Sequence, residues 1–427
     1  MSALFLVVIL FIGLAMGVPV AISLGLASIS TILLFADQSL LSLSQRFFHT
    51  TQIYPLLAVP FFILAATFMT TGGVAKRMID FANALVGHFR GGLAMAALLA
   101  CAFFSAVSGS APATVVAVGS VMIGGMIRSG YSERFAAGVI CNAGTLGILI
   151  PPSIVMVIYG AVTETSIGNL FLAGMLPGAI LTIAMMITIA VIARRQDLPR
   201  QPRMSLKETI HAGWEAFWGL ILLVIILGGI YLGIFTPTEA AAVSAVYAFI
   251  VAVFVYKDIK LKDVPQVLTE SAKITAMLMF IIANAYLFAF VLTTEQIPQI
   301  ASEWIVGLGL PPWGFLIVVN ILLLVFGNFM EPTSVVLILT PIIFPIATQM
   351  GIDPIHLGVI MVLNMQIGLV TPPVGLNLFV TASVAKMPME DVIRAAIPWL
   401  MVLLSVLIII TYIPIVSLIV PSLLGVL

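Results

Sequence analysis

The sequence predicts an all-α, polytopic membrane protein made of two inverted repeats, each with a re-entrant helical hairpin and a broken helix. Of the 427 residues, 62% are hydrophobic and 8% are charged, too few polar residues to give a water-soluble core of this size a polar surface. Apolar runs of roughly 20 residues, the length of a membrane-spanning helix, recur from end to end. The third observation is a pattern of proline and glycine that occurs twice.

The two copies of this pattern are related by a nearly constant shift along the chain. The matching pairs, 220 or 221 positions apart, are Pro112 and Pro332, Gly130 and Gly351, Pro151 and Pro372, and Pro177 and Pro398. We predict a single integral membrane domain over 1–427, with repeat 1 at 54–193 and repeat 2 at 274–420. The segments 1–53 and 214–273 are predicted to be scaffold helices.

The first half of the chain predicts spans, surface helices and one hairpin. In order, these are helices at 3–17 and 18–36, an interfacial helix at 37–53, a span at 54–71, an amphipathic arm at 74–88, a hairpin at about 91–128, a broken helix at about 132–160 and a span at 168–193. From Gly91 to Ile127 no residue is charged, and a polar tip, Ser108–Ser110, lies in the middle of this run. Arg194 to Glu215 is the main polar loop.

The second half follows the same plan. In order, it predicts spans at about 214–233 and 236–256, a basic loop at 257–273, a span at 274–293, an amphipathic arm at 295–307, a hairpin at about 312–350, a broken helix at about 355–385 and a last span from about 396. Small residues beside prolines interrupt both broken helices, at Gly144–Pro152 and at Gly368–Thr371.

The basic residues lie almost all on one side of this topology. If 54–71 runs from outside to inside, the cytoplasmic segments hold 16 of the 17 Lys and Arg residues, and only Arg46 is outside. Those segments are 72–91, 128–134, 194–213, 257–273 and 386–394. Such a bias fixes orientation and places both chain ends outside. It also makes the repeats inverted, because an odd number of crossings separates their matching points.

Each uncharged run returns to the side it left, so the charges fit either a re-entrant hairpin or two full crossings. We favour hairpins, because full crossings would leave the polar tips Ser108–Ser110 and Glu331–Ser334 in short external turns. Irregular backbone at membrane depth survives only where protein or a water-filled cavity satisfies its polar groups. A hairpin tip that faces a broken helix supplies such a cavity.

The breaks offer oxygen ligands to Na⁺, since an interrupted helix frees backbone carbonyls. In repeat 1 the candidate sodium ligands are Ser105, Ser108, Asn142, Gly144, Gly147 and Pro151. In repeat 2 they are Gly327, Asn328, Gly368 and Thr371. We therefore expect two or more sodium sites.

Helix N-termini at the same breaks favour an anion. We expect the oxygens of a carboxylate to contact Ser110, Thr114, Thr333, Ser334 and Asn377. An isolated serine or threonine in a membrane helix more often bonds the carbonyl four residues earlier or packs closely, but here tip and break occur together twice. No Lys or Arg lies near either tip, so an anion there would need sodium as its counter-charge.

Glu331 has two interpretations that the sequence leaves open. An acid at the tip of the second hairpin is costly in a membrane unless it has a task. It binds a cation or proton, or it holds the tip by accepting backbone N–H bonds. Repeat 1 has no counterpart, because Ala111 aligns with Glu331.

Missing motifs exclude other classes of protein. A net charge of zero argues against nucleic-acid binding. The chain has no His-Glu-x-x-His pair, no paired intramembrane aspartates and no Ser/His dyad, which argues against an enzyme. It has no Gly-x-x-x-x-Gly-Lys loop for ATP, so an ion gradient would have to supply energy. Its histidines, predicted in loops or surface helices, have no metal-ligand spacing: His49, His88, His211 and His356.

Six segments resemble the large membrane subunit of tripartite ATP-independent periplasmic (TRAP) transporters. They are Thr71-Gly-Gly-Val-Ala-Lys-Arg77, Gly87-His-Phe-Arg-Gly-Gly92, Val107-Ser-Gly-Ser-Ala-Pro-Ala-Thr114, Gly144-Thr-Leu-Gly-Ile-Leu-Ile-Pro-Pro152, Thr236-Pro-Thr-Glu-Ala-Ala241 and Gly368-Leu-Val-Thr-Pro-Pro373. The resemblance covers nearly the full chain. It implies the transport subunit of a sodium-coupled importer in a bacterial inner membrane, with an elevator motion of the hairpins and broken helices against the outer helices. It implies as partners a small four-helix membrane subunit and a periplasmic substrate-binding protein.

The first tip also bears on the substrate. Its Pro112 and Thr114 are more similar to members that handle C4-dicarboxylates, such as malate, succinate or fumarate, than to members that handle sialic acid. The alternative is a sodium–dicarboxylate symporter or an ion antiporter that needs no binding protein, since such proteins share inverted repeats with hairpins. Uptake of free substrate without a binding protein would distinguish the two.

Overall fold

The computed structural model describes residues 2–35, 40–50, 52–307 and 309–426. Every regular element over these residues is a helix, which confirms the all-α fold class. Among the described residues, nine helices are long and apolar enough to cross a membrane. They are Tyr54–Thr71, Ala111–Arg128, Ile167–Arg195, Leu206–Tyr231, Pro237–Val255, Leu261–Thr294, Pro312–Phe329, Pro332–Gln349 and Met389–Tyr412.

The first half of the chain forms the helices that the apolar runs predict. They are α1 (Ser2–Ala15), α2 (Val20–Phe35), α3 (Leu40–Thr50), η1 (Tyr54–Leu57), α4 (Ala58–Thr71), α5 (Val74–Val86), α6 (Gly92–Ser108), α7 (Ala111–Arg128), α8 (Glu133–Ala143), η2 (Gly144–Ile148), α9 (Ile154–Thr163) and α10 (Ile167–Arg195). The predicted broken helix is therefore α8, η2 and α9. Part of the predicted interfacial helix 37–53 lies outside the described residues.

The second half consists of helices as well. They are α11 (Leu206–Tyr231), α12 (Pro237–Ile250), η3 (Val251–Val255), η4 (Leu261–Asp263), α13 (Val264–Thr294), α14 (Ile297–Gly307), α15 (Pro312–Phe329), α16 (Pro332–Gln349), α17 (Pro354–Gly368), α18 (Leu376–Ala385), α19 (Met389–Tyr412) and α20 (Ile415–Leu423). Here the broken helix is α17 and α18, with irregular backbone between them.

Several predicted boundaries were wrong. α11 begins at Leu206 rather than 214, because Ser205 and Glu208 form a capping box at its start. α13 begins at Val264, so much of the segment predicted as a basic loop forms its first turns. α19 begins at Met389 rather than 396, and α20 was not predicted.

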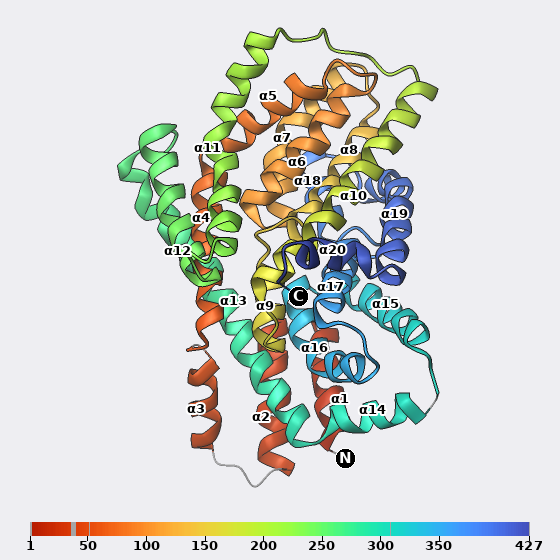
Figure 1. Cartoon of the computed structure of the whole chain (residues 1–427). Helices are drawn as coiled ribbons and strands as arrows, with labels where there is room; N and C mark the ends of the chain where they lie inside the picture. The colour runs from red at the N-terminus through yellow and green to blue at the C-terminus, as the bar shows by residue number, and fades with distance from the viewer. Residues whose placement is uncertain (1, 36–39, 51, 308, 427) are drawn as a thin grey trace.

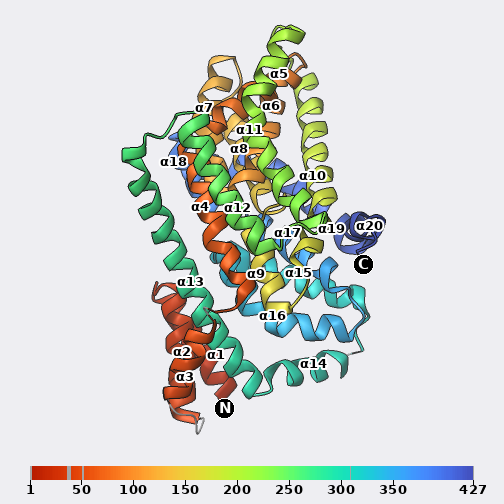
Figure 2. The same ribbon diagram turned by 60° about the vertical axis from the view of Figure 1, so that its left-hand side comes forward.

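The two hairpins lie at different ends of the molecule. In Figure 1, α5 to α8 occupy the upper part and α14 to α16 the lower part. Figure 2 shows α13 running along one edge, with α1, α2 and α3 beside its lower part. α13 packs against α2, α4 and α16, so it contacts both the first helices and the second hairpin.

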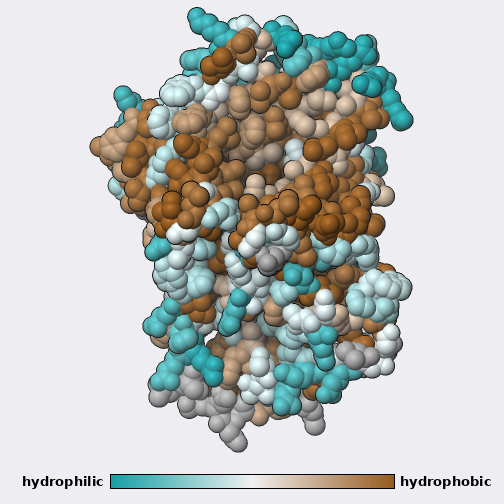
Figure 3. All heavy atoms as spheres, in the orientation of Figure 1, coloured by the Kyte–Doolittle hydropathy of each residue, from teal (hydrophilic) through white to brown (hydrophobic). Residues whose placement is uncertain are grey.

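The surface suits a bilayer. Large apolar side chains face outward on α10, where Ile183 is 55% exposed and Ile187 is 59% exposed. Figure 3 shows apolar residues gathered across the middle of one face and polar residues at its upper end. Because water would penalise so much apolar surface, these outer faces are expected to contact lipid.

The two halves share backbone turns in register. Glu164 and Lys386 follow the two broken helices, and both adopt a left-handed conformation, with φ of 56° and 54°. Gly130 and Gly351 follow the two hairpins and have φ of 92° and 79°. Residues with side chains seldom adopt this conformation, and it occurs at the corresponding place in each half, but the repeat itself stays a prediction.

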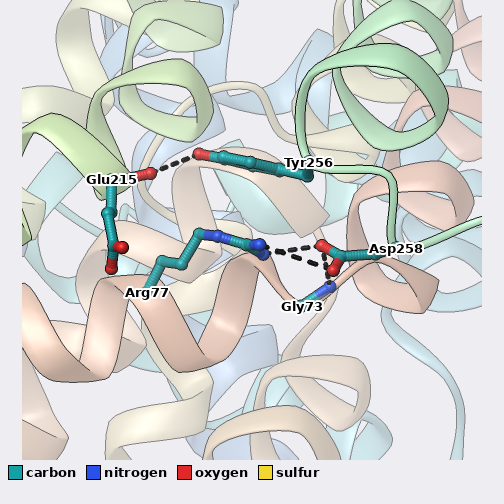
Figure 4. A network of polar contacts seen from close by, with 5 residues as sticks. All are labelled: Gly73, Arg77, Glu215, Tyr256 and Asp258. Atoms are coloured by element: carbon teal, nitrogen blue, oxygen red, sulfur yellow. Dashed lines mark hydrogen bonds and ion pairs between the residues drawn. The ribbon is translucent and has the colours of Figure 1, made fainter.

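A polar joint fixes the α5 arm to the helices beside it (Figure 4). Arg77 Nη1 lies 2.6 Å from Asp258 Oδ2, and the same oxygen accepts from Gly73 N at 3.0 Å. The Arg77 guanidinium also lies over the ring of Tyr256, 3.8 Å from its centre. Tyr256 donates to the carbonyl oxygen of Glu215 at 2.5 Å, and burial raises the pKa of Tyr256 to about 12, so this hydroxyl keeps its proton. The joint ties the arm that precedes hairpin 1 to α11 and to the loop after η3.

Candidate functional site

Hairpin 1 consists of α6 and α7, and its tip packs directly against the first break. A Cβ added to Gly147 would lie 2.8 Å from the carbonyl carbon and oxygen of Ser110. A Cβ added to Gly144 would lie 2.2 Å from Cγ2 of Val115. Contacts this close leave room only for glycine. The glycines predicted in the first sodium site therefore allow the tip to reach the break.

The hydroxyls of tip 1 are not equivalent. The Ser108 and Thr114 hydroxyl oxygens lie 3.0 Å apart, and Thr114 Oγ1 donates to the Ser110 carbonyl oxygen at 2.9 Å. Ser105 Oγ donates to the carbonyl oxygen of Cys101 at 2.5 Å, within its own helix. That bond is the ordinary arrangement of a helical serine. Ser108, unlike Ser105, lines a cavity in front of the tip.

Hairpin 2 consists of α15 and α16, and it meets the second break backbone to backbone. A Cβ added to Gly368 would lie 2.5 Å from the carbonyl carbon of Gly327 and 2.6 Å from its carbonyl oxygen. Thr371 Oγ1 donates to the carbonyl oxygen of Ile367 at 2.7 Å. Repeat 2 thus brings together three of the four residues predicted for its sodium site.

Asn328, the fourth of these residues, holds the irregular backbone after the break. Its Nδ2 donates to the carbonyl oxygen of Pro372 at 2.6 Å, and its Oδ1 accepts from Val374 N at 3.1 Å. Its own carbonyl oxygen accepts from Gly375 N at 3.2 Å. Freed backbone groups buried in protein need such partners, so this one side chain supplies what the missing helical bonds would have supplied.

Glu331 is the N-cap of α16. Its carboxylate accepts from Thr333 Oγ1 at 2.7 Å and from Ser334 N at 3.3 Å. This arrangement satisfies free N–H groups at the start of a helix. The geometry therefore supports the tip-holding interpretation of Glu331. Because Glu331 also lines the cavity in front of the tips, its carboxyl group borders the same space.

Both tips open on one central cavity of about 600 Å³. Hairpin 1 contributes Ser108 and Ser110, and hairpin 2 contributes Glu331, Thr333 and Ser334. The other walls come from α2, α4 and α13 and from residues beside the two breaks. The volume suits a small organic ligand, and an apolar wall with few polar groups is typical of such sites.

Most of the predicted site residues do not line this cavity, and three of those that do not are buried polar side chains with other partners. Thr114 is fully buried beneath Ser108. Asn142 Nδ2 donates to the carbonyl oxygen of Gly138 at 2.9 Å. Asn377 Nδ2 donates to the carbonyl oxygen of Cys141 at 3.4 Å, which joins α18 to α8. The Oδ1 atoms of both asparagines are buried and have no hydrogen-bond partner among the described residues.

The sequence interpretation missed the contribution of α4. Thr67 and Thr70 line the cavity, and Thr67 Oγ1 donates to the carbonyl oxygen of Ile63 at 2.7 Å. Two threonines three positions apart share one face of a helix. This spacing is the feature of the sequence that could have indicated their place in the site. The apolar lining from α13, such as Met277, has no signal in the sequence, since any span presents such residues.

Comparison with known proteins identifies the family. The model of the family described as "Tripartite ATP-independent periplasmic transporter, DctM component" matches residues 7–416. The chain belongs to this family. It is 64% identical over 403 residues to the C4-dicarboxylate TRAP transporter large permease protein DctM of Pseudomonas aeruginosa, covering 94% of each chain. It is 40% identical over 413 residues to the isethionate TRAP transporter permease protein DctMQ of Oleidesulfovibrio alaskensis, which is 96% of this chain and 64% of that protein.

A solved structure shares the fold. The YdaH transporter of Alcanivorax borkumensis, whose crystal structure is described as having an unusual topology, matches with a TM-score of 0.56 at 14% identity. The match covers 86% of this chain and 88% of that one. The chain is therefore a TRAP large permease, a multi-pass protein of the inner membrane, and the relatives named above are permeases rather than enzymes.

Proposed function

We propose that this chain is the transport subunit of a sodium-coupled importer of C4-dicarboxylates such as malate, succinate or fumarate. The relative at 64% identity is named for C4-dicarboxylates. The observation that carries the proposal is the meeting of both tips, far apart in the chain, on one cavity of about 600 Å³. A four-carbon diacid fits such a space, and its oxygens find hydroxyls on both tips.

The substrate carboxylate belongs at tip 1. Helix α16 starts at Glu331, whose carboxyl group already caps its N-terminus. Helix α7 starts at Ser110, which makes no side-chain cap, and its first turn has no acid. The positive end of the α7 dipole is therefore the one left to attract an anion. Ser334 faces the same cavity from tip 2 and would donate to the far end of the substrate, because its Oγ is buried with no partner among the described residues. Thr333 also lines the cavity, but its hydroxyl hydrogen is already used on Glu331.

Sodium fits the two breaks. A hard cation prefers oxygen ligands, and at the second break the Gly327 backbone lies against Gly368 with Thr371 nearby. Thr371 Oγ1 uses its hydrogen on Ile367, so its lone pairs remain available. Among the described residues that line the cavity, none is Lys or Arg. Co-transported sodium would then compensate the charge of the diacid, in the field of Glu331.

The proposed motion moves hairpins and broken helices as one block past α2, α4 and α13. The cavity lies between the hairpins and broken helices on one side and α2, α4 and α13 on the other. A site that a moving block carries past fixed helices would lie in this position. Its α13 wall is apolar at Ile274, Met277 and Ile281, which slide without losing hydrogen bonds. Hairpin 1 in the upper part of Figure 1 and hairpin 2 in the lower part agree with inverted repeats. The placement of both tips on an internal cavity favours re-entrant hairpins.

The partners follow from the relatives. This chain covers 64% of the length of the relative named DctMQ, whose name supports a small Q subunit as a partner of this chain. The periplasmic binding protein of a tripartite system would deliver the acid to the outer face.

Uptake into proteoliposomes tests the function. The vesicles contain this chain with its small subunit, and labelled succinate is supplied on its binding protein. An inward sodium gradient is expected to drive accumulation, and an equal potassium gradient is not. The variant Ser110→Ala is expected to lower uptake, whereas Ser120→Ala, at an exposed serine on the same helix, is not. Equal uptake in sodium and potassium would refute the coupling.

Two further arms separate the alternatives. Accumulation of free succinate without the binding protein would favour the self-sufficient symporter. Competition by unlabelled sialic acid at the same concentration as unlabelled succinate would refute the C4-dicarboxylate assignment.

A further inference from the structure

A second cavity, of about 670 Å³, lies between α3 and the end of α13. Arg46, His49 and Thr50 line it from α3, and Phe290 and Thr293 line it from α13. Arg46 is the one Lys or Arg in the sequence that falls outside the five basic segments. The proposed topology therefore puts a single fixed positive charge on the outer side, inside a cavity.

Arg46 is placed to bind an anion. Its guanidinium lies over the ring of Phe290, with Cζ 3.7 Å from the ring centre. A guanidinium stacked on a ring uses its face, so the N–H donors along its edge remain free. Among the described residues, no acid forms an ion pair with Arg46. The planar fork of Arg matches a carboxylate with two parallel hydrogen bonds.

A third cavity adjoins both this site and the second hairpin. It measures about 260 Å³ and shares Tyr286, Ala289 and Thr293 with the cavity at Arg46. Its other walls are α9 and α16, where Thr163 and Thr340 add hydroxyls. The Tyr286 hydroxyl is buried and has no hydrogen-bond partner among the described residues. Hydroxyl groups thus continue from Arg46 toward α16.

Helix α13 sets the spacing between these sites. The central cavity touches α13 from Ile274 to Ile281, and the Arg46 cavity touches it at Tyr286 to Thr293. A helix rises by 1.5 Å per residue, so Leu278 and Phe290 lie roughly 18 Å apart along the axis. The start of α16 lines the central cavity, and its later residues line the third cavity. A block that slides along α13 would carry tip 2 toward Arg46.

We propose that the cavity at Arg46 is an outer anion site, in which Arg46 binds a carboxylate of the arriving substrate before the moving block receives it. The proposal rests on the proposed function, because it names where that substrate first meets this chain. The phosphate of a lipid headgroup has the same oxyanion chemistry, so the test must separate the two.

Charge variants at Arg46 test the proposal in the reconstituted complex. Arg46→Gln is expected to raise the succinate concentration for half-maximal uptake about tenfold at low ionic strength, the effect of one charge-assisted hydrogen bond. Arg46→Lys keeps the charge and is expected to raise this succinate concentration less. Added salt is expected to reduce the difference between Arg46→Gln and wild type. The control Arg200→Gln removes an exposed charge from the loop after α10 and is expected to change nothing. An unchanged half-maximal concentration in Arg46→Gln would overturn the proposal.

A binding measurement separates failure of this site from failure of the proposed function. Thr293 is exposed, and the native Cys101 and Cys141 are buried, so Thr293→Cys offers one reactive thiol. Succinate is expected to slow its labelling by a membrane-impermeant thiol reagent, and Arg46→Gln is expected to abolish that protection. Protection from labelling measures binding alone, so it tests the site even if uptake proves independent of sodium. No protection by succinate would overturn the site while leaving the uptake result standing.

Vesicle composition identifies a lipid occupant. The difference in half-maximal succinate concentration between wild type and Arg46→Gln is expected to be the same in phosphatidylcholine vesicles and in vesicles that also contain phosphatidylglycerol. A difference seen only with the anionic lipid would assign the cavity to a headgroup phosphate and overturn its role for the substrate.

Discussion

The variant Gly368→Ala tests the closest contact in the proposed second sodium site. The added Cβ would lie 2.5 to 2.8 Å from the carbonyl carbon, carbonyl oxygen and Cα of Gly327. Carbon atoms in contact prefer about 3.5 to 4.0 Å, so hairpin 2 and α17 would have to separate by about 1 Å. All three neighbours are backbone atoms, so rotation of a side chain cannot relieve the clash.

The size of the effect follows from this displacement. Overpacking of this kind costs about 1 to 3 kcal/mol of stability, whereas alanine in place of a helical glycine would otherwise gain up to about 1 kcal/mol. A displacement of about 1 Å at a binding site can lower a rate about 100-fold. We therefore expect Gly368→Ala to melt at a lower temperature and to transport succinate at about one hundredth of the wild-type rate. Residual uptake is expected to need more sodium, because the same backbone atoms form the proposed site.

A matched control isolates the contact. Gly125 lies in α7, and a Cβ added there would meet nothing within 4 Å. Gly125→Ala is expected to transport like wild type and to be as stable or slightly more stable. Thermal unfolding in detergent and sodium-driven uptake in proteoliposomes measure the two effects. If Gly368→Ala matched Gly125→Ala in stability, rate and sodium dependence, the described approach of hairpin 2 to the second break would be wrong.

Three further predictions concern single interactions. Thr371→Ala is expected to raise the sodium concentration for half-maximal uptake severalfold. The control Thr348→Ala removes an exposed threonine whose hydroxyl also donates to the carbonyl four residues earlier, and it is expected to leave that concentration unchanged. The same half-maximal sodium concentration in both variants would count against the second sodium site. Glu331→Ala is expected to lose about 0.5 to 2 kcal/mol of stability, because a helix cap is lost. Glu331→Gln is expected to recover the stability in unfolding measurements but not the sodium affinity in uptake assays. Recovery of both quantities would show that the carboxyl group has no role beyond capping. In a double-mutant cycle of Arg77→Gln and Asp258→Asn, unfolding measurements are expected to give a coupling free energy of about 1 kcal/mol, because the pair is mostly shielded from solvent; a coupling near zero would show that the joint in Figure 4 does not stabilise the arm.

The places where the backbone leaves the helix could be predicted from the sequence. Glycine and proline set these breaks through local conformation, so η2 and the segment between α17 and α18 occur where Gly144–Pro152 and Gly368–Thr371 predicted them. The polar tips could also be located, since they interrupt uncharged runs. Repeat organisation, sodium ligation and substrate contacts stay predictions.

The faces that meet in three dimensions could not be predicted. His356, expected in a surface helix or loop, is instead buried in α17, where its ring nitrogens lie 3.1 Å from Ser417 Oγ and 3.2 Å from the carbonyl oxygen of Thr411. Those partners lie more than 50 positions away in sequence, so no local pattern reveals them. Asn377 faces α8 for the same reason, because the orientation of α18 depends on distant helices.

The most direct test of the account asks whether tip 1 faces the substrate. Ser110→Cys places one reactive thiol in the central cavity, while the native cysteines remain buried. In the reconstituted complex, a small thiol reagent is expected to label this cysteine, and sodium together with succinate is expected to slow the labelling more than either does alone. Labelling that is indifferent to both would contradict a shared site for sodium and the acid between the two tips.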